Sequence, residues 1–270
     1  SHAQPADWLA AADGSWSDAA NWMGGAVPNG GGFDVTIDAT GAPYTVTLDI
    51  NATVNSFLLD SADATFAMAG RTLSVGASAV LDSGRAVLNN AGFAGGGTLT
   101  NNTDFDVFGN VSVSTSSFDQ NGTLTLTATG GQNASLNVTT SLTNAGEMNL
   151  TSNAATSASV SVAGTLANNA GGVINVLAGA GGTRTLAAST LVNDGTINTG
   201  IGLALNATNG TYTNNGAWNV TAGTTAFQGS GLLTFNQDAG TLSLQGAFAV
   251  NGEVFNFNGG QILGNNLSLT

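Results

Sequence analysis

The stretch Leu191-Val-Asn-Asp-Gly-Thr-Ile197 contains a unit that recurs along this chain of 270 residues. The unit is a large apolar residue, then Asn or Gln two positions on, then Gly, then two apolar residues separated by one. A weaker copy begins at Leu99, and the last copy is degenerate. The period of 20 to 25 residues predicts one turn of a parallel β-helix, built from three short strands joined by tight turns. The copies begin at Phe118, Leu142, Leu166, Leu191, Tyr212, Phe235 and Phe255.

An amide residue stands at the same place in six of these copies. Asn and Gly adopt left-handed backbone conformations that turn a chain sharply between strands. Amide side chains at one height in successive turns can also stack and exchange hydrogen bonds along the axis. The repeat therefore predicts a turn ladder along the axis, made of Gln120, Asn144, Asn168, Asn193, Asn214 and Gln237.

The patterning between these units is that of strands. Tyr44-Thr-Val-Thr-Leu48, Leu124-Thr-Leu126 and Leu242-Ser-Leu244 alternate apolar residues with Thr or Ser, as in a strand with one buried face. Because parallel crossovers are nearly always right-handed, we expect an all-β, single-stranded, right-handed parallel β-helix. A β-sandwich would show less regular spacing, and a propeller would have a period nearer 40 residues.

The composition changes at about residue 43. All three prolines and three of the four tryptophans, Trp8, Trp16 and Trp22, lie at or before that point. Central strands donate every backbone N–H to a neighbour, and Pro cannot, so the Pro-free remainder suits an uninterrupted ladder. We expect an N-terminal cap segment over residues 1–43 and the β-helix over residues 44–270, with Trp218 in the core.

Charge and composition exclude several classes of function. The net charge is −13, and the only basic side chains besides His2 are Arg71, Arg85 and Arg184, too few to neutralise nucleic-acid phosphates. The chain has no Lys or Cys, and its single His lies in an opening that reads as a signal-peptide remnant or a tag scar. No stretch approaches 18 consecutive apolar residues, so we expect no membrane insertion of this segment.

Residues 14–38 read Gly14-Ser-Trp16-Ser-Asp-Ala-Ala-Asn21-Trp22, then Gly24-Gly-Ala-Val-Pro28-Asn29, then Phe33-Asp-Val-Thr-Ile-Asp38. Followed by alternating strands and Leu-x-Asn-x-Gly-x-Ile repeats, this opening resembles bacterial autotransporter-like and PEP-CTERM-type surface proteins with adhesin-like β-solenoids. The resemblance is one of pattern and composition, and it covers nearly the whole chain. It implies a secreted or surface-exposed structural, adhesive or matrix role, and it brings no catalytic residues with it.

Paired carboxylates are the first candidate site. Asp104 and Asp106 are two residues apart, so on a strand both side chains point to the same side. Such a pair could contribute to a calcium site, which needs six to eight oxygen ligands, or act as an acid/base pair on a polysaccharide. Two solvated aspartates at a turn are the commoner arrangement. The glycine-rich calcium nonapeptide of β-rolls is not found, because Gly95-Gly-Gly97 lacks the Asp in register.

Aromatic and basic residues offer two alternatives. Exposed faces of Trp16 and Trp22 could stack on sugar rings, although closing the N-terminal end of the core is the favoured role for these side chains. A polysaccharide lyase needs a base, for which the arginines are the candidates. Arg71 and Arg85, which flank Asp82, are more typical of a surface ion-pair cluster, and Arg184 is expected in a loop.

The final stretch, residues 261–270, continues a strand pattern with no charge, Pro or helix to cover it. Solenoid ends need polar capping, so we expect a segment of a longer protein, or an end that pairs with another copy. The sequence thus predicts a non-enzymatic, secreted or cell-surface structural or adhesive β-solenoid module, with surface polysaccharide as a further partner. A carbohydrate-binding module is the first alternative, and a polysaccharide lyase or hydrolase is the second. No cofactor is expected, apart from calcium.

Overall fold

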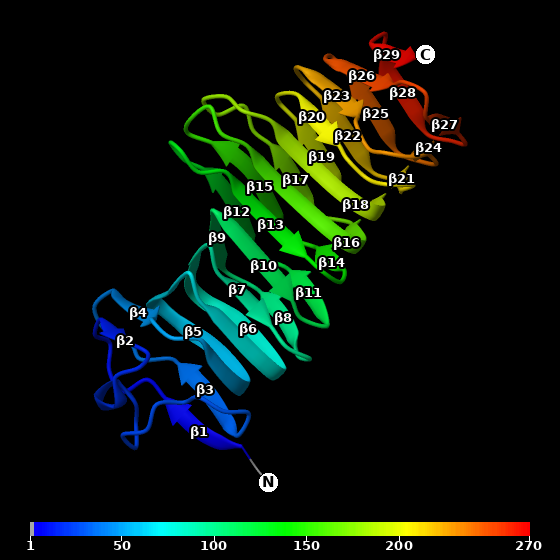
Figure 1. Ribbon diagram of the computed structural model, residues 1–270. Coiled ribbons are helices and arrows are strands. Elements are labelled where there is room, and N and C mark those ends of the chain that lie inside the picture. Colours follow the sequence, from blue (N-terminus) through cyan, green and yellow to red (C-terminus); the bar gives the residue numbers. More distant parts are fainter. Residues whose placement is uncertain (1–2) are drawn as a thin grey trace.

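The computed structural model describes residues 3–270, so the opening Ser1 and His2 lie outside the described residues. Within that range the chain forms 29 β-strands and one short 3-10 helix, η1 (Ala19–Asn21). Each strand pairs in parallel with strands one turn before or after it, and the turns stack into a rod with the chain ends at opposite ends (Figure 1). About eleven turns are stacked in this way. The predicted all-β parallel β-helix is confirmed.

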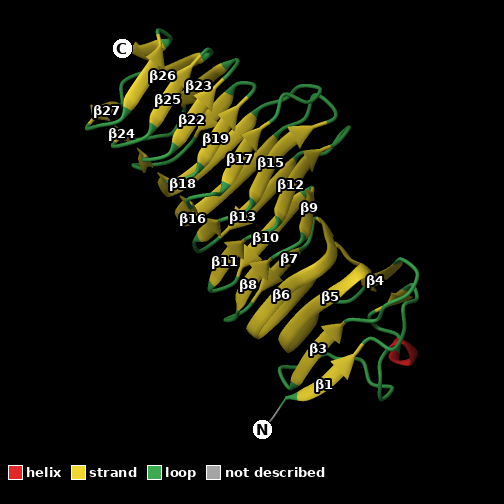
Figure 2. Ribbon diagram, turned by 180° about the vertical axis from the view of Figure 1, so that it is seen from behind, coloured by secondary structure: helices red, strands yellow, loops and turns green. Residues whose placement is uncertain are grey.

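Three strips of parallel strands run along the rod, and we call them the A, B and C faces in chain order within a turn (Figures 1 and 2). The A face contains β7 (Gly92–Ala94), β10 (Asn110–Ser114), β13 (Ala134–Val138), β20 (Leu203–Leu205), β23 (Thr224–Phe227), β26 (Ala247–Val250) and β29 (Leu267–Leu269). The B face contains β1 (Gln4–Asp7), β3 (Phe33–Ile37), β8 (Thr98–Asn101), β11 (Ser117–Gln120), β14 (Leu142–Asn144), β21 (Thr211–Asn214), β24 (Thr234–Gln237) and β27 (Val254–Phe257).

The C face contains β2 (Gly14–Ser15), β4 (Tyr44–Leu48), β9 (Asp104–Phe108), β12 (Thr123–Ala128), β15 (Glu147–Ser152), β17 (Val173–Val176), β19 (Thr196–Thr199), β22 (Ala217–Val220), β25 (Thr241–Leu244) and β28 (Gln261–Gly264). Four longer strands bend around corners of the rod. These are β5 (Ala52–Ala69) and β6 (Thr72–Asn89), which contribute to all three faces, and β16 (Ala158–Asn168) and β18 (Arg184–Asn193), which contribute to the A and B faces.

The repeat sets the register of the B face. The large apolar residue that begins each copy pairs with its counterpart in the next copy, from Leu99 through Phe118 to Phe255. These side chains form one inward column, buried as far as Phe235 and partly buried at Phe255. The copies therefore stack in register, because each apolar residue makes the same packing contacts as its counterpart one turn earlier. A slip by one residue would turn the whole column outward.

Parallel pairing already begins inside the segment expected to act as a cap. Strand β1 pairs with β3, and β3 pairs with the central part of β5, so strand stacking crosses the expected boundary at residue 43. Trp8, Trp16 and Trp22 are buried in the same segment, and their rings meet edge to face, with centroids 5.0 and 4.7 Å apart. The segment therefore supplies both the first strands of the rod and an aromatic cluster at its N-terminal end.

Candidate functional site

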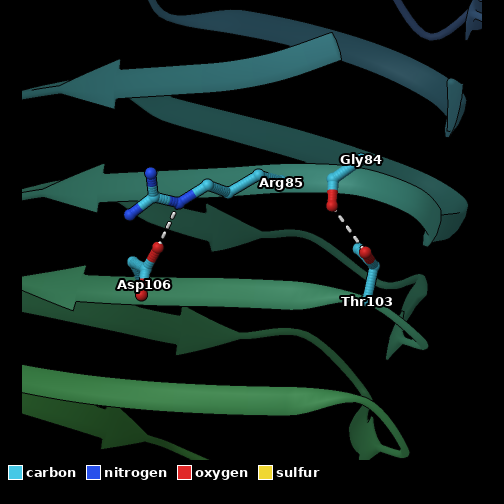
Figure 3. Close-up of polar contacts among 4 residues, drawn as sticks. All are labelled: Gly84, Arg85, Thr103 and Asp106. Carbon is cyan, nitrogen blue, oxygen red and sulfur yellow. Dashed lines mark hydrogen bonds and ion pairs between the residues drawn. The ribbon is translucent and has the colours of Figure 1, made fainter. Parts of the chain in front are cut away.

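The two carboxylates singled out by the sequence lie on the outer side of β9, on the C face. Asp104 is exposed, whereas Asp106 is 16% exposed and forms an ion pair with the Nε of Arg85 at 2.5 Å (Figure 3). In the strand register Arg85 lies directly opposite Asp104, and its guanidinium reaches the carboxylate of Asp106, two residues further along β9. One turn-edge contact lies close by, where the Thr103 hydroxyl donates to the carbonyl of Gly84 at 2.5 Å (Figure 3).

This arrangement disfavours the calcium interpretation. The Arg85 guanidinium already supplies the positive charge that the Asp106 carboxylate faces, and it would repel a cation placed between the two aspartates. No group of three or more His, Cys, Asp or Glu side chains able to hold a metal is found among residues 3–270.

Arg85 also pairs with Asp106 rather than with Asp82, whose carboxylate instead accepts a hydrogen bond from Asn102. The prediction that Arg85 forms an ion-pair cluster with Asp82 is therefore wrong, because Arg85 pairs with Asp106 instead.

The two tryptophans proposed for glycan stacking are inside the protein. Trp16 is 0% exposed and Trp22 is 1% exposed. Their indole N–H groups donate to main-chain carbonyls, that of Trp16 to Pro28 and that of Trp22 to Trp16. A sugar ring needs an accessible aromatic face, so in this structure the two rings close the core and present no platform to solvent. Trp218 is also fully buried, as expected.

The turn ladder is present at the corner between the B and C faces. Asn144, Asn168, Asn193 and Asn214 each donate their side-chain Nδ2 to the amide oxygen of the next residue in the series, at 2.7, 2.7, 2.7 and 2.9 Å. All six predicted members are 0% exposed. Asn101, which the sequence indicated only through its weak copy, begins the series by donating to Gln120 at 2.7 Å.

The series has one interruption and two apolar ends. The Gln120 amide donates to the carbonyls of Gly122 and Glu147, and the Oδ1 of Asn144 is buried without a hydrogen-bond partner. In the same register column Leu81 precedes Asn101, and Phe257 follows Gln237. The ladder therefore spans the middle of the rod, in two runs of side-chain hydrogen bonds.

A second ladder, which the repeat did not predict, lies on the outside of the C face. Asn175 donates to Asn149, Asn198 to Asn175 and Asn219 to Asn198, each at 3.0 Å. The signal that could have found it is the Asn that directly follows the first inward apolar residue of four successive C-face strands, as in Ile174-Asn-Val176 and Ile197-Asn-Thr199. These partly buried amides tie successive turns together at the surface.

Arg184 is not the loop residue expected from the sequence. It begins β18, is 0% exposed and points into the core, in register with Ala158 and Leu203. Main-chain carbonyls of Ala178 and Gly181 accept hydrogen bonds from its guanidinium at 2.9 Å, and burial lowers the pKa of Arg184. An arginine side chain remains charged in proteins, and this one is buried among core residues. Its hydrogen bonds therefore hold the loop before β18 in place.

Shallow hollows follow the A face. The first, of about 430 Å³, is lined by Arg71, Asn90, Asn110, Ser112 and Ser114 among others. Two more, of about 290 and 240 Å³, lie further along the same face. They exist because small side chains point outward from these strands, such as those of Ser112, Ser161 and Ala204.

Within the described residues, the only helix has three residues, far too few for a membrane span. Comparisons with protein families, with curated proteins and with solved structures give no match to this chain.

Proposed function

We propose that this chain is a non-enzymatic structural module, a stiff rod that forms part of a secreted or cell-surface protein. The observation that carries the proposal is the buried amide ladder from Asn144 to Gln237, which links successive turns by side-chain hydrogen bonds. A buried amide that donates to the amide of the next turn resists both bending and register slip, because either would leave buried polar groups unpaired.

The rest of the molecule supports the same role. The core continues from Ala6 to Val250, with side chains of successive turns in contact, so each turn is stabilised by its neighbours. The Asp106 carboxylate on the C face is neutralised by Arg85, and the buried Arg184 is held by main-chain carbonyls. An acidic, lysine-free composition and the likeness to bacterial surface solenoids support an extracellular location.

The experiment that tests the rod is small-angle X-ray scattering of the purified chain, with an activity screen on the same sample. Stacked strands are ~4.8 Å apart, so eleven turns predict a monomer about 50 Å long with a uniform cross-section. Release of reducing or unsaturated sugar ends from any polysaccharide in a broad panel would contradict the non-enzymatic role. A flexible or collapsed scattering profile would contradict the stiff rod.

Glycan binding is a second candidate, favoured by the hollows of the A face rather than by the tryptophans. The hollows lie one after another along one face and are edged by hydroxyl and amide groups, which suits an extended neutral polysaccharide. Ser112→Gln would fill the first hollow, whereas Thr125→Gln on the C face is a matched control. Glycan retention that weakens in Ser112→Gln alone would support this candidate, and equal retention by both variants would exclude the A-face groove.

A further inference from the structure

Six Asn–Gly pairs occur in the chain, at Asn29, Asn121, Asn209, Asn215, Asn251 and Asn258. An Asn followed by Gly is chemically vulnerable, because the Gly backbone nitrogen can attack the Asn side-chain carbonyl carbon with no Cβ in the way. The attack requires the Gly N–H to give up its proton and the peptide unit to turn. A Gly N–H that is held in a hydrogen bond resists both changes.

The fold holds five of these six Gly nitrogens. Gly30 donates to the Thr53 carbonyl at 2.6 Å, and Gly252 donates to the Thr270 carbonyl at 2.7 Å. The other three lie at the corner of the buried ladder. Gly122, Gly216 and Gly259 donate to the main-chain carbonyls of the ladder residues Asn101, Asn193 and Gln237, at 2.9, 2.8 and 3.1 Å.

The ladder corner thus protects its own Asn–Gly turns. The carbonyl of Asn193, for example, accepts from both Asn215 and Gly216, each at 2.8 Å. The Asn215 side chain is also engaged, donating to Asp194 at 2.8 Å. To react, these turns must first open locally, and each opening separates one layer of the rod from the next.

Asn209 is the exception. It lies in the turn between β20 on the A face and β21 on the B face, with an exposed side chain and a left-handed φ of 53°. Across the described part of the chain, the nitrogen of Gly210 donates to no acceptor, although the Gly210 carbonyl accepts from Thr234. The Asn209 Oδ1 accepts the N–H of Leu232 at 3.1 Å, which draws electrons from the side-chain carbonyl carbon and favours attack on it.

We propose that Asn209 is a site of spontaneous modification in the folded protein, by cyclisation onto Gly210 and hydrolysis to aspartate or isoaspartate. In the first step a bond forms between the Gly210 nitrogen and the Asn209 Cγ, and the side-chain nitrogen leaves as ammonia with the Gly210 proton. Water then opens one of the two ring C–N bonds of the succinimide. Hydrolysis at Cγ gives aspartate, and hydrolysis at the main-chain carbonyl gives isoaspartate, which lengthens the backbone of this turn by one carbon.

The test is peptide mapping of the intact chain after prolonged incubation at mildly alkaline pH. Conversion adds about 1 Da and one negative charge. We expect Asn209 to convert at least about fivefold faster than Asn121 and Asn215, whose turns must open first. The same incubation in denaturant is the control, and there the six sites should react within about threefold of one another because protection by the fold is lost.

An Asn209→Gly variant, which suits the left-handed φ, should lose the fast phase of acidic-variant formation and retain the slow one. The proposal is overturned if Asn209 reacts no faster than Asn121 and Asn215 in the folded chain. It is also overturned if Asn209→Gly leaves the fast phase unchanged, since that phase would then come from another residue.

Discussion

The side-chain Nδ2 of Asn144 donates to the Oδ1 of Asn168 at 2.7 Å, although the two residues belong to different turns and neither has any exposed surface. The same nitrogen also lies 3.3 Å from the carbonyls of Gly146 and Val173. One amide group therefore donates to the main chain of its own turn and to both a side chain and the main chain of the next turn. A buried polar group of this kind is tolerated only because almost every partner is in place.

Replacing a central ladder residue should cost far more than replacing an outer one. Asn168→Ala removes the acceptor of the Asn144 amide and the donor to Asn193, so two buried groups lose a partner. Each such group costs about 1–3 kcal/mol, and we expect a loss of about 2–4 kcal/mol in the free energy of unfolding. Denaturant titration measures it.

Asn175→Ala is the matched control, because Asn175 lies in the outer ladder, partly open to water. We expect a loss below about 1 kcal/mol there, since water replaces the missing partners. Equal losses in the two variants would mean that burial of the ladder does not matter, and that the stiffness attributed to it has another source.

The interruption of the ladder predicts a stabilising substitution. In Gln120→Asn the shorter amide matches the Asn–Asn steps of the other turns and can donate to the Asn144 Oδ1, which now lacks a partner. Satisfying that oxygen outweighs the lost methylene group, for a gain of up to about 1 kcal/mol in unfolding free energy. Gln237→Asn is the control: its neighbour in the column is Phe257, so no partner is gained and stability should fall.

The repeat was sufficient to predict the architecture because each copy places one apolar and one amide residue at fixed points of a turn. Leu142, Leu166 and Leu191 pair one on one in the structure, and the amides two residues later pair likewise. The strand status of residues 4–37 was harder to predict, because two of the three prolines and three tryptophans lie in that segment. There β1 pairs with β3 and β3 with β5, but none of these strands carries a copy of the repeat that would indicate the register.

The side-chain environments were less predictable than the fold. Arg184 follows Gly181-Gly-Thr, which is typical of a loop, and only the register with Ala158 shows that its side chain points inward. The residues next to Trp16 and Trp22 in the sequence suit either a cap or an exposed platform. In the structure Trp16 packs against Phe57 and Phe66, and this packing buries it. The partner of Arg85 lies 21 residues away, at a distance set by the length of one turn.

Calcium should have little effect on the intact chain. The Arg85 guanidinium is paired with Asp106, so added millimolar calcium should change the melting temperature by less than about 1 °C. Arg85 is 52% exposed, and Arg85→Ala should itself cost less than about 1 kcal/mol. A clear stabilisation of the wild-type chain by calcium, lost in Asp106→Asn, would show that the ion displaces the arginine.

The last described turn should promote self-association of the 270-residue chain. Phe257, Leu263 and Leu269 are about half exposed there, at 55%, 49% and 55%. Because apolar side chains and free strand edges favour pairing, we expect the sedimentation coefficient to rise with concentration. A Phe257→Asn, Leu263→Thr, Leu269→Thr variant should remain monomeric. A monomeric wild-type chain at high concentration would contradict pairing through this end.

Alkaline pH should destabilise the protein through Tyr212. Burial raises the pKa of Tyr212 from 10.0 to about 12, although its hydroxyl accepts the N–H of Ala188. The unfolded chain then loses the phenol proton first, so the stabilising contribution is complete below pH 10 and is lost as the pH rises toward 12. At 1.36 kcal/mol per pH unit the loss approaches about 3 kcal/mol. Tyr44, whose pKa is also raised by burial, adds to it.

Unfolding free energies measured across this window should fall less steeply for Tyr212→Phe than for the wild type. Parallel slopes would mean that Tyr212 ionises normally in the folded chain. The slope is the decisive measurement, because Tyr212→Phe also leaves the Ala188 N–H unpaired and lowers stability at every pH.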